Sequence, residues 1–369
     1  MPPLDDVTLA ARLRRVVSRG DLPGSDGGVY NPGAVLTAEG IVLLARREID
    51  YRFTPIVHAE RIVLDPGTLE VTGHRTLRRR GFPEDARIED FRLIEHAGEL
   101  LAVHTIVRGD TIRPMLSRVT DTHIEPADPL ALPIALDPIE KNWVLFEHRG
   151  ALHCLYKLDP LTIFARDASG RWSLVKRADN GWADGFRGPL SNSANLIPFA
   201  GGHLGFWHSI VDGRYVQGAL LLGPDLELRA RTGILLDGRR ADRGHKPGVL
   251  YVSSLVAEGG RILAFYGEGD AHTAVAIFDA AELSAELDRR PFVPVAEPVT
   301  IRFAPTSMGH AFRAMVGFRE LAERMAEPHL WLHVAHPALA EIVRRFGVPG
   351  LTVRDLADAD AHDYEVGAA

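Results

Sequence analysis

The stretch A-R-I-E-D-F-R-L-I-E-H-A-G-E-L-L-A-V-H-T-I-V, residues Ala86 to Val107, decides how the chain folds. Two runs of apolar residues flank His96-Ala97-Gly98-Glu99, and period-2 runs around a glycine-containing turn predict a β-hairpin. The first run begins with Glu89-Asp90-Phe91-Arg92, although strands usually contain few acidic residues. A solvated strand end with a surface ion pair explains this charge as well as a functional site does. Whether the same pattern recurs elsewhere in the chain therefore distinguishes the two explanations.

The same hairpin pattern recurs along the chain. Its turn glycines lie at positions 98, 150, 202 and 260, and Gly40 precedes them at a similar interval. Even spacing of roughly 50 residues, with a few strands in each unit, is typical of a β-propeller. Five units fit between about residues 28 and 305, whereas a sandwich or two stacked barrels would not space the turns so evenly. The sequence therefore predicts an all-β, five-bladed β-propeller.

The two ends of the chain have a different pattern. Residues 7–19 have the apolar spacing of an amphipathic helix and predict a short N-terminal helix. Residues 310–325 and 337–346 contain strong helix formers at helical spacing, and they predict a C-terminal helical extension that packs on the propeller or serves assembly. The predicted domains are an N-terminal helical extension, a catalytic propeller and a C-terminal helical extension, over residues 1–27, 28–305 and 306–369.

Composition excludes several classes of protein. The net charge of −7 and the pI near 6.1 argue against a nucleic-acid-binding or membrane-surface protein, because both need a basic face. The single cysteine, Cys154, excludes an intramolecular disulfide and a multi-cysteine metal site. No apolar run is long enough for a signal peptide or a membrane span. We expect a cytoplasmic protein, and the C-terminal helices are compatible with a homo-oligomer.

The innermost strands of a propeller converge on a central channel, so polar groups at their entrances meet at one mouth. Asp90 and Asn142 each stand eight residues before a turn glycine, which predicts equivalent positions on successive blades. The other candidates are charged or polar residues near strand ends: Asn31, Arg47, Asp50, Glu89, Arg92, Glu140, Lys141, Arg187, His208, Lys246, Glu268 and Asp270. Each alone is more often a structural ion pair, and their recurrence favours a site. No histidine and acid cluster has metal-ligand spacing, so we expect no metal.

Several motifs, in their order and spacing, give the chain a family resemblance over about residues 30 to 280. They are Asn31-Pro32-Gly33-Ala34, Glu89-Asp90-Phe91-Arg92, Arg187-Gly188-Pro189, Trp207-His208 with the following Arg214–Leu222, and Tyr266-Gly267-Glu268-Gly269-Asp270. The chain resembles the five-bladed propellers of glycoside hydrolase family 130, the β-mannoside phosphorylases and their hydrolytic and transferase relatives. Phe91 replaces the proline of the family's E-D-P-R-type motif. Glu140-Lys141-Asn142-Trp143 resembles mannosyltransferase-like propellers related to the family.

The resemblance implies roles for individual residues. Asp90 matches the family's single essential acid, which protonates the glycosidic oxygen while phosphate attacks the anomeric carbon from the opposite face. The residues matched to sugar binding are Asn31, Arg47, Arg92, Asn142, Tyr215 and Asp270. The residues at or near the phosphate-binding places are Lys141, Lys157, Arg187 and His208. This chain has lysine at two positions where the family has arginine, and arginine where the family has lysine. The positive charge is kept, but the geometry of the hydrogen bonds to phosphate changes.

These roles predict an inverting enzyme that acts on β-mannosidic bonds of an oligosaccharide or glycoside. Phosphorolysis to a sugar 1-phosphate is the leading reaction, with inorganic phosphate as co-substrate and no other cofactor. Hydrolysis stays open, because hydrolytic relatives replace the cations by water-activating acids and Glu140, Glu147 and Glu268 are available. Glycosyl transfer to another sugar is also compatible with these residues, and so is a propeller that binds sugar without catalysing a reaction.

Overall fold

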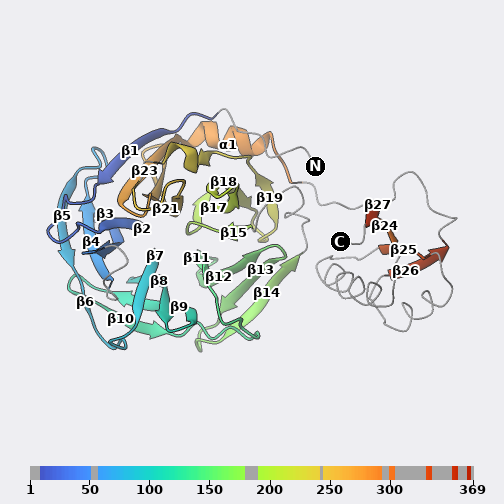
Figure 1. The fold of residues 1–369 in the computed structure, drawn as a ribbon, viewed down its shortest axis with the longest axis horizontal. Helices are drawn as coiled ribbons and strands as arrows, with labels where there is room; N and C mark the ends of the chain where they lie inside the picture. Colours follow the sequence, from blue (N-terminus) through green and yellow to red (C-terminus); the bar gives the residue numbers. More distant parts are fainter. Residues whose placement is uncertain are drawn as a thin grey trace. The chain divides into compact units, whose positions relative to one another are not determined.

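The computed structural model describes residues 9–50, 57–178, 190–241 and 244–292, together with four short strands nearer the C-terminus. Five sheets, antiparallel except for the short parallel pairing of β6 with β10, lie in a ring as the blades of a propeller (Figure 1). This confirms the predicted five-bladed, all-β fold. The innermost strands of the blades surround a common axis, and the polar ends of these strands therefore come close together.

The first three blades are built from strands that follow one another in sequence. The first contains β2 (Gly28–Thr37), β3 (Gly40–Glu48), β4 (His58–Leu64) and β5 (Val71–Thr76). The second contains β7 (Arg87–His96), β8 (Glu99–Arg108), β9 (Thr111–Val119) and β10 (His123–Asp128), with β6 (Arg78–Arg79) beside β10. The third contains β11 (Val144–His148), β12 (Ala151–Leu158), β13 (Leu161–Arg166) and β14 (Trp172–Ala178).

The last two blades are less regular. The fourth contains β15 (Ser191–Asn192), β16 (Ile197–Phe199), β17 (Gly202–Val211), β18 (Arg214–Leu222), β19 (Leu228–Arg231) and β20 (Leu236–Asp237), and a short 3-10 helix, Gly238–Arg240, follows it. The fifth contains β21 (Leu250–Glu258), β22 (Arg261–Glu268), β23 (His272–Asp279) and, from the other end of the chain, β1 (Arg12–Val17). The helix α1 (Ala280–Asp288) follows β23.

The predicted hairpin turns owe their geometry to local sequence. Ala97 and Gly98 join β7 to β8 with φ angles of +51° and +78°, and two central residues with positive φ are typical of a type I′ turn. The same combination of positive φ angles occurs in the corresponding turns at Arg149-Gly150, Ala200-Gly201 and Gly259-Gly260. In the fourth blade the turn glycine is therefore Gly201 and not Gly202, which begins β17.

The prediction of an N-terminal helix over residues 7–19 is wrong. Residues 12–17 form β1, which pairs antiparallel with β23 in a register that places Arg12 opposite Ile277. Val17, buried to 1% exposure, packs into the core at the end of β1. The first strand of the chain thus completes the last blade, so pairing with a distant strand overrides the helical spacing of the apolar residues.

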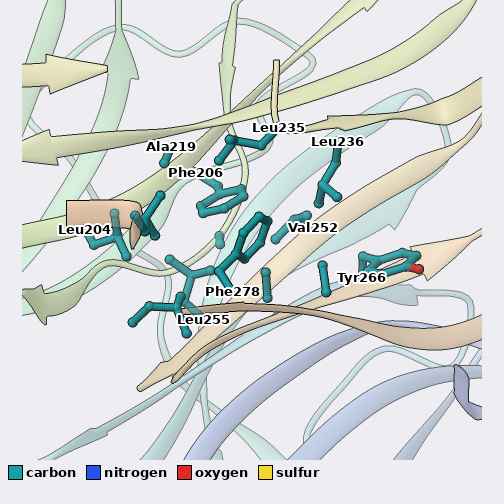
Figure 2. Packing of buried hydrophobic residues seen from close by; sticks show 14 of the residues in the cluster. Leu204, Phe206, Ala219, Leu235, Leu236, Val252, Leu255, Tyr266 and Phe278 are labelled. Atoms are coloured by element: carbon teal, nitrogen blue, oxygen red, sulfur yellow. The ribbon is translucent and has the colours of Figure 1, made fainter. Parts of the chain in front are cut away.

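Alternating apolar side chains fill the space between the blades. Figure 2 shows Phe206 of the fourth blade and Phe278 of the fifth within one buried cluster. Their ring centroids lie 6.0 Å apart, and neither ring is more than 1% exposed. Burying such a side chain contributes about 1.5–3 kcal/mol relative to leaving it in water. This packing fixes the blades on which the polar residues at the channel mouth stand.

The C-terminal part of the chain contributes a second compact unit, to which residues from Pro294 onward belong. It contains four parallel strands in the order β26 (Leu351–Asp355), β25 (Leu330–Val334), β24 (Val299–Phe303) and β27 (Tyr364–Val366). This parallel sheet was not predicted from the sequence, which indicated helices alone. The two predicted helices, over 310–325 and 337–346, lie outside the described residues. No helix in the described part of the chain has the length and apolar character needed to cross a membrane.

Three histidines cluster on the third and fourth blades, away from the channel mouth. His148 Nδ1 lies 2.9 Å from His203 Nε2, and the His153 ring packs edge-on against His148. Burial lowers the pKa of all three imidazoles, and the neighbouring histidines lower those of His148 and His203 further, His203 to about 4. Arg149 also lowers the pKa of His148, whereas Asp225 raises it. The cluster is therefore neutral near pH 7.

We expect this cluster to make the propeller less stable in acid. Because the folded-state pKa values lie below the usual 6.5, the unfolded chain binds more protons, and the free energy of unfolding falls as pH decreases from about 6.5 toward 4. His153 and His203, which are buried, each contribute a slope of up to about 1.4 kcal/mol per pH unit, and the more exposed His148 contributes less. Denaturant titrations at pH 7 and 4.5 should show a smaller acid loss for His203→Gln than for the wild type. His123→Gln, on β10, is the control, and equal acid losses in all three proteins would contradict the expectation.

Candidate functional site

A cavity of about 370 Å³ lies where the inner strands of the five blades begin. Every blade contributes to it, and most of its lining is polar. The lining residues are Asn31, Arg46, Glu89, Asp90, Lys141, Asn142, Ser191, His208, Ile210, Tyr215, Lys246, Val249, Tyr251 and Asp270. Many of the residues predicted to meet at the channel mouth therefore do so.

Three successive blades place an Asn or Asp at the same backbone position. Asn31, Asp90 and Asn142 have φ angles of +51°, +57° and +63°, a left-handed conformation that Asn and Asp adopt more readily than most residues. Asn31 and Asp90 lie in β-bulges of β2 and β7, where the pairing register shifts. A bulge re-aims side chains, which explains why the consecutive residues Glu89 and Asp90 both line the cavity. The predicted equivalence of Asp90 and Asn142 is thus confirmed in the backbone.

Asp90 is positioned by a neighbouring blade. Asn31 Nδ2 donates a hydrogen bond to Asp90 Oδ1 at 2.8 Å. Asn31 is in turn confined by Gly267 of β22, where a Cβ atom would lie only 2.0 Å from Asn31 Oδ1. Gly267 does not have a positive φ, so glycine is needed here because a side chain would not fit, and not because of the backbone conformation. The carboxylate therefore depends on close packing between the first and fifth blades.

Arg92 lies behind the cavity and joins four blades. It is 2% exposed and does not line the cavity. Its guanidinium donates to the backbone oxygens of Ser193 at 2.7 Å and Asp90 at 3.1 Å, and it also donates to the Tyr251 hydroxyl. The Tyr251 hydroxyl donates to Asn142 Oδ1 at 2.9 Å. Arg92, predicted to bind sugar, instead holds the residues that line the cavity.

The two neighbouring arginines of β3 have different surroundings. Arg46 lines the cavity, with NH1 3.1 Å from Glu89 Oε2 and an ion pair to Glu48. Arg47, predicted to bind sugar, does not line it, because its Nε lies 3.1 Å from Glu60 Oε2 and its NH1 donates to the Pro23 oxygen. Burial raises the pKa of Glu89, and Arg46 opposes that rise. Arg46 is therefore the arginine of this pair that a bound molecule would meet.

The predicted phosphate-binding residues divide into three groups. Lys141 lines the cavity and makes no ion pair with any residue that the structure describes. His208 also lines it, and burial together with Arg92 and Lys141 lowers its pKa to about 3, so it is a neutral hydrogen-bonding group near pH 7. Lys157 is exposed, lies over the Tyr156 ring and is not part of the lining. Arg187 lies outside the described residues.

The fifth blade contributes Asp270 to the same cavity. Asp270 has a φ of +51° in the turn between β22 and β23, and its Oδ2 lies 2.7 Å from Lys246 Nζ. Tyr215 of β18 also lines the cavity, and burial, Asp90 and Asp270 together raise the pKa of its hydroxyl. Asp270 and Tyr215, both predicted to bind sugar, therefore share one cavity with Asp90.

The three acids considered for hydrolysis are not in the cavity. Glu140 accepts hydrogen bonds from Trp143 Nε1 at 3.2 Å and from the Tyr156 hydroxyl at 3.0 Å. Glu147 lies 2.8 Å from His96, and Glu268 lies 2.8 Å from Arg15. Across the ranges that the structure describes, no group of three or more His, Cys, Asp or Glu residues is arranged to hold a metal ion.

Some lining residues were not predicted from the sequence, namely Arg46, Ser191, Ile210, Val249 and Tyr251. Strand periodicity is a signal that could have found three of them. Ile210 follows His208 by two residues on β17, and alternate residues of a strand share one face. Val249 and Tyr251 have the same spacing at the start of β21. Ser191 and Arg46 carry no comparable signal.

Comparison with known proteins supports the fold. No protein-family model matches the chain, and no curated protein matches it in sequence. Among solved structures, β-1,2-mannobiose phosphorylase from Listeria innocua in complex with β-1,2-mannobiose has a TM-score of 0.57 at 16% identity, covering 76% of this chain and 100% of that chain. A putative glycosidase from Bacteroides thetaiotaomicron has a TM-score of 0.54 at 15% identity, covering 68% and 87%.

A third similar structure comes from work on the GH130 family of mannoside phosphorylases and its glycoside hydrolases that target β-1,2-mannosidic linkages in Candida mannan. Its TM-score is 0.52 at 12% identity, with 69% of this chain and 85% of that chain covered. At these identities the similarity shows a shared fold. The chain has the five-bladed propeller fold of mannoside phosphorylases and related glycosidases, as its motifs predicted.

Proposed function

We propose that this chain is a carbohydrate-active enzyme that cleaves or forms β-mannosidic bonds with inversion, and that its main reaction is phosphorolysis to a sugar 1-phosphate. The observation that carries the proposal is the position of Asp90. It lines a polar cavity, has a left-handed backbone and accepts a hydrogen bond from Asn31. Such backbone strain costs about 1–3 kcal/mol and concentrates at functional sites.

Asp90 acts as the general acid. Its proton passes to the glycosidic oxygen, directly or through a sugar hydroxyl, as the bond from that oxygen to the anomeric carbon breaks. A phosphate oxygen forms the new bond from the opposite face, which inverts the configuration. Because phosphate arrives as an anionic nucleophile, the reaction needs no second carboxylate to activate water.

The cavity contains groups suited to an anion beside this acid. Lys141 supplies a positive charge that no described carboxylate neutralises by an ion pair, and His208 adds a neutral hydrogen-bonding group. Charge-assisted hydrogen bonds of this kind are stronger than neutral ones. Lysine presents a point charge and not a planar fork, so it places few constraints on how the phosphate is oriented.

Hydrolysis is the less favoured reaction. An inverting hydrolase needs a second carboxylate to activate water, and Glu140, Glu147 and Glu268 do not line the cavity. Glu89 does line it, but Arg46 at 3.1 Å and Arg87 at 2.6 Å both pair with it. Asp270 also lines it and pairs with Lys246 at 2.7 Å. Glycosyl transfer to another sugar would use Asp90 in the same way and differs only in the acceptor.

Incubation with a panel of β-mannosides, with and without inorganic phosphate, tests the proposal. We expect a sugar 1-phosphate that forms only when phosphate is present. Free mannose at the same rate in both conditions would instead establish hydrolysis and direct attention to Glu89 and Asp270, the other carboxylates of the cavity. Saturable sugar binding without any product would support a transferase that lacks its donor, or a binding protein.

Lys141→Ala should weaken the use of phosphate more than the use of the sugar. Hydrogen bonds to charged groups contribute about 1.5–3 kcal/mol, so the KM for phosphate should rise roughly 10- to 100-fold. The KM for the mannoside should change by less than about threefold, because the lost charge serves the anion. Steady-state kinetics with each substrate varied in turn measures both values, with Lys176→Ala on β14 as the control. Equal increases in the two KM values would assign Lys141 to the sugar.

A further inference from the structure

The segment from Gly244 to Val249, just before β21, is attached to the turn that carries Asp270. The backbone N–H groups of His245 and Lys246 both donate to the Gly269 oxygen, at 2.7 and 2.9 Å, and Gly269 N donates to the Val249 oxygen at 2.8 Å. A Cβ atom on Gly244 would lie 2.4 Å from the Gly269 oxygen. The segment and the turn therefore form one closely packed unit, held by the backbone.

This unit places two opposite charges side by side on the cavity wall. Lys246 Nζ lies 2.7 Å from Asp270 Oδ2, and both side chains line the cavity. The lysine side chain is 48% exposed, whereas that of Asp270 is 9% exposed, so the ammonium lies nearer to solvent. Tyr215, another lining residue, donates its backbone N–H to the Gly248 oxygen at 3.0 Å. The segment is thus bonded both to the turn of the fifth blade and to β18 of the fourth blade.

We propose that Lys246 is a specificity-determining residue that binds, together with Asp270, two adjacent hydroxyl groups of the sugar. The inference rests on the proposed function, since it takes a sugar as the occupant of the cavity. A lysine ammonium only donates hydrogen bonds and a carboxylate only accepts them, whereas a hydroxyl does both. One hydroxyl donates to Asp270 while its neighbour accepts from Lys246, so the pair selects sugars that present both.

The chemistry of a polar wall explains how such a pair discriminates between sugars. An analogue without one of the hydroxyls loses one charge-assisted hydrogen bond, and sites built to bind a hydroxyl reject such analogues strongly. The ion pair itself keeps both charges satisfied when the cavity holds only water. Because the backbone hydrogen bonds hold the segment, loss of the Lys246 side chain should leave the fold intact.

The test compares the binding of methyl β-mannoside and its monodeoxy analogues to the whole chain by calorimetry. Lys246→Met should bind the parent sugar roughly 10- to 100-fold more weakly than the wild type, because it loses one hydrogen bond from a charged group. One deoxy analogue, the one that lacks the hydroxyl bound by Lys246, should bind both proteins equally. Lys246→Arg should recover part of the affinity, and Lys176→Met is the matched control.

The outcomes separate this inference from the proposed function. A variant Lys246→Met that binds the parent sugar like the wild type overturns the inference alone. Equal weakening across all deoxy analogues also overturns it, because Lys246 would then act only by positioning the turn. A wild-type chain that binds no mannoside overturns the proposed function and, with it, this inference.

Discussion

Replacing Asp90 with Asn should lower turnover by a factor of at least about 10²–10⁴ and leave sugar binding within a few fold. Asparagine keeps the shape of the side chain but cannot supply the proton, and general acid catalysis is worth about that factor. The fold should survive, because Asn31 and Asn142 already occupy the equivalent left-handed positions of the neighbouring blades.

Two measurements on the same protein check this expectation. Release of sugar 1-phosphate reports turnover, and calorimetric titration with the same mannoside reports binding. Asp225→Asn, on the loop before β19, is the matched control, since that carboxylate lies outside the cavity. Unchanged turnover in Asp90→Asn would reject Asp90 as the acid, and no turnover in either protein would favour a sugar-binding propeller.

Gly267→Ala should impair catalysis strongly, although it adds only one methyl group. The new Cβ would lie 2.0 Å from Asn31 Oδ1 and 2.9 Å from the Asn31 backbone nitrogen, so Asn31 has to move and its hydrogen bond to Asp90 is lost. Overpacking of this kind costs about 1–3 kcal/mol of stability. We expect kcat to fall about 10- to 100-fold, since small misplacements of catalytic groups have large effects.

A double substitution separates the steric cause from others. Asn31→Ala removes Oδ1, the atom nearest to the new methyl group, and leaves only the backbone nitrogen at 2.9 Å, so Gly267→Ala should lower kcat and Tm less in that background than in the wild type. Gly73→Ala, on β5, is the control, because a Cβ there has no other atom within 4 Å. Fully additive losses in the double variant would show that the two residues act independently.

The sequence was sufficient for most of the propeller because its hairpins depend on local chemistry. Gly98 and Gly150 mark type I′ turns, and the position of each turn sets the register of its strands. The outermost strand of the last blade could not be found in this way. The apolar spacing of residues 12–17 suits a helix. These residues form a strand because they pair with β23, which is close in space but more than 250 residues later in the sequence.

The same distinction applies to the cavity. Asp90 and Asn142 could be placed because each has a fixed offset from its own hairpin turn. Arg46 lines the cavity and Arg47 does not, because Arg47 pairs with Glu60 on the next strand. No sequence motif indicates this pairing. Tyr251 lines the cavity because Arg92, from another blade, holds its hydroxyl, and such a contact is visible only in the folded chain.

The pairing of β1 with β23 has a consequence for synthesis on the ribosome. Arg15 of β1 also pairs with Glu268 of β22, the strand next to β23, although 253 residues separate the two in sequence. At about 5–20 residues per second, translation of that interval takes roughly 13 to 50 s, during which the first strand has no partner. Unpaired strand edges can pair with other chains. The nascent chain therefore carries an unpaired first strand until β23 is made, and the pairing of β1 with β23 then completes the last blade.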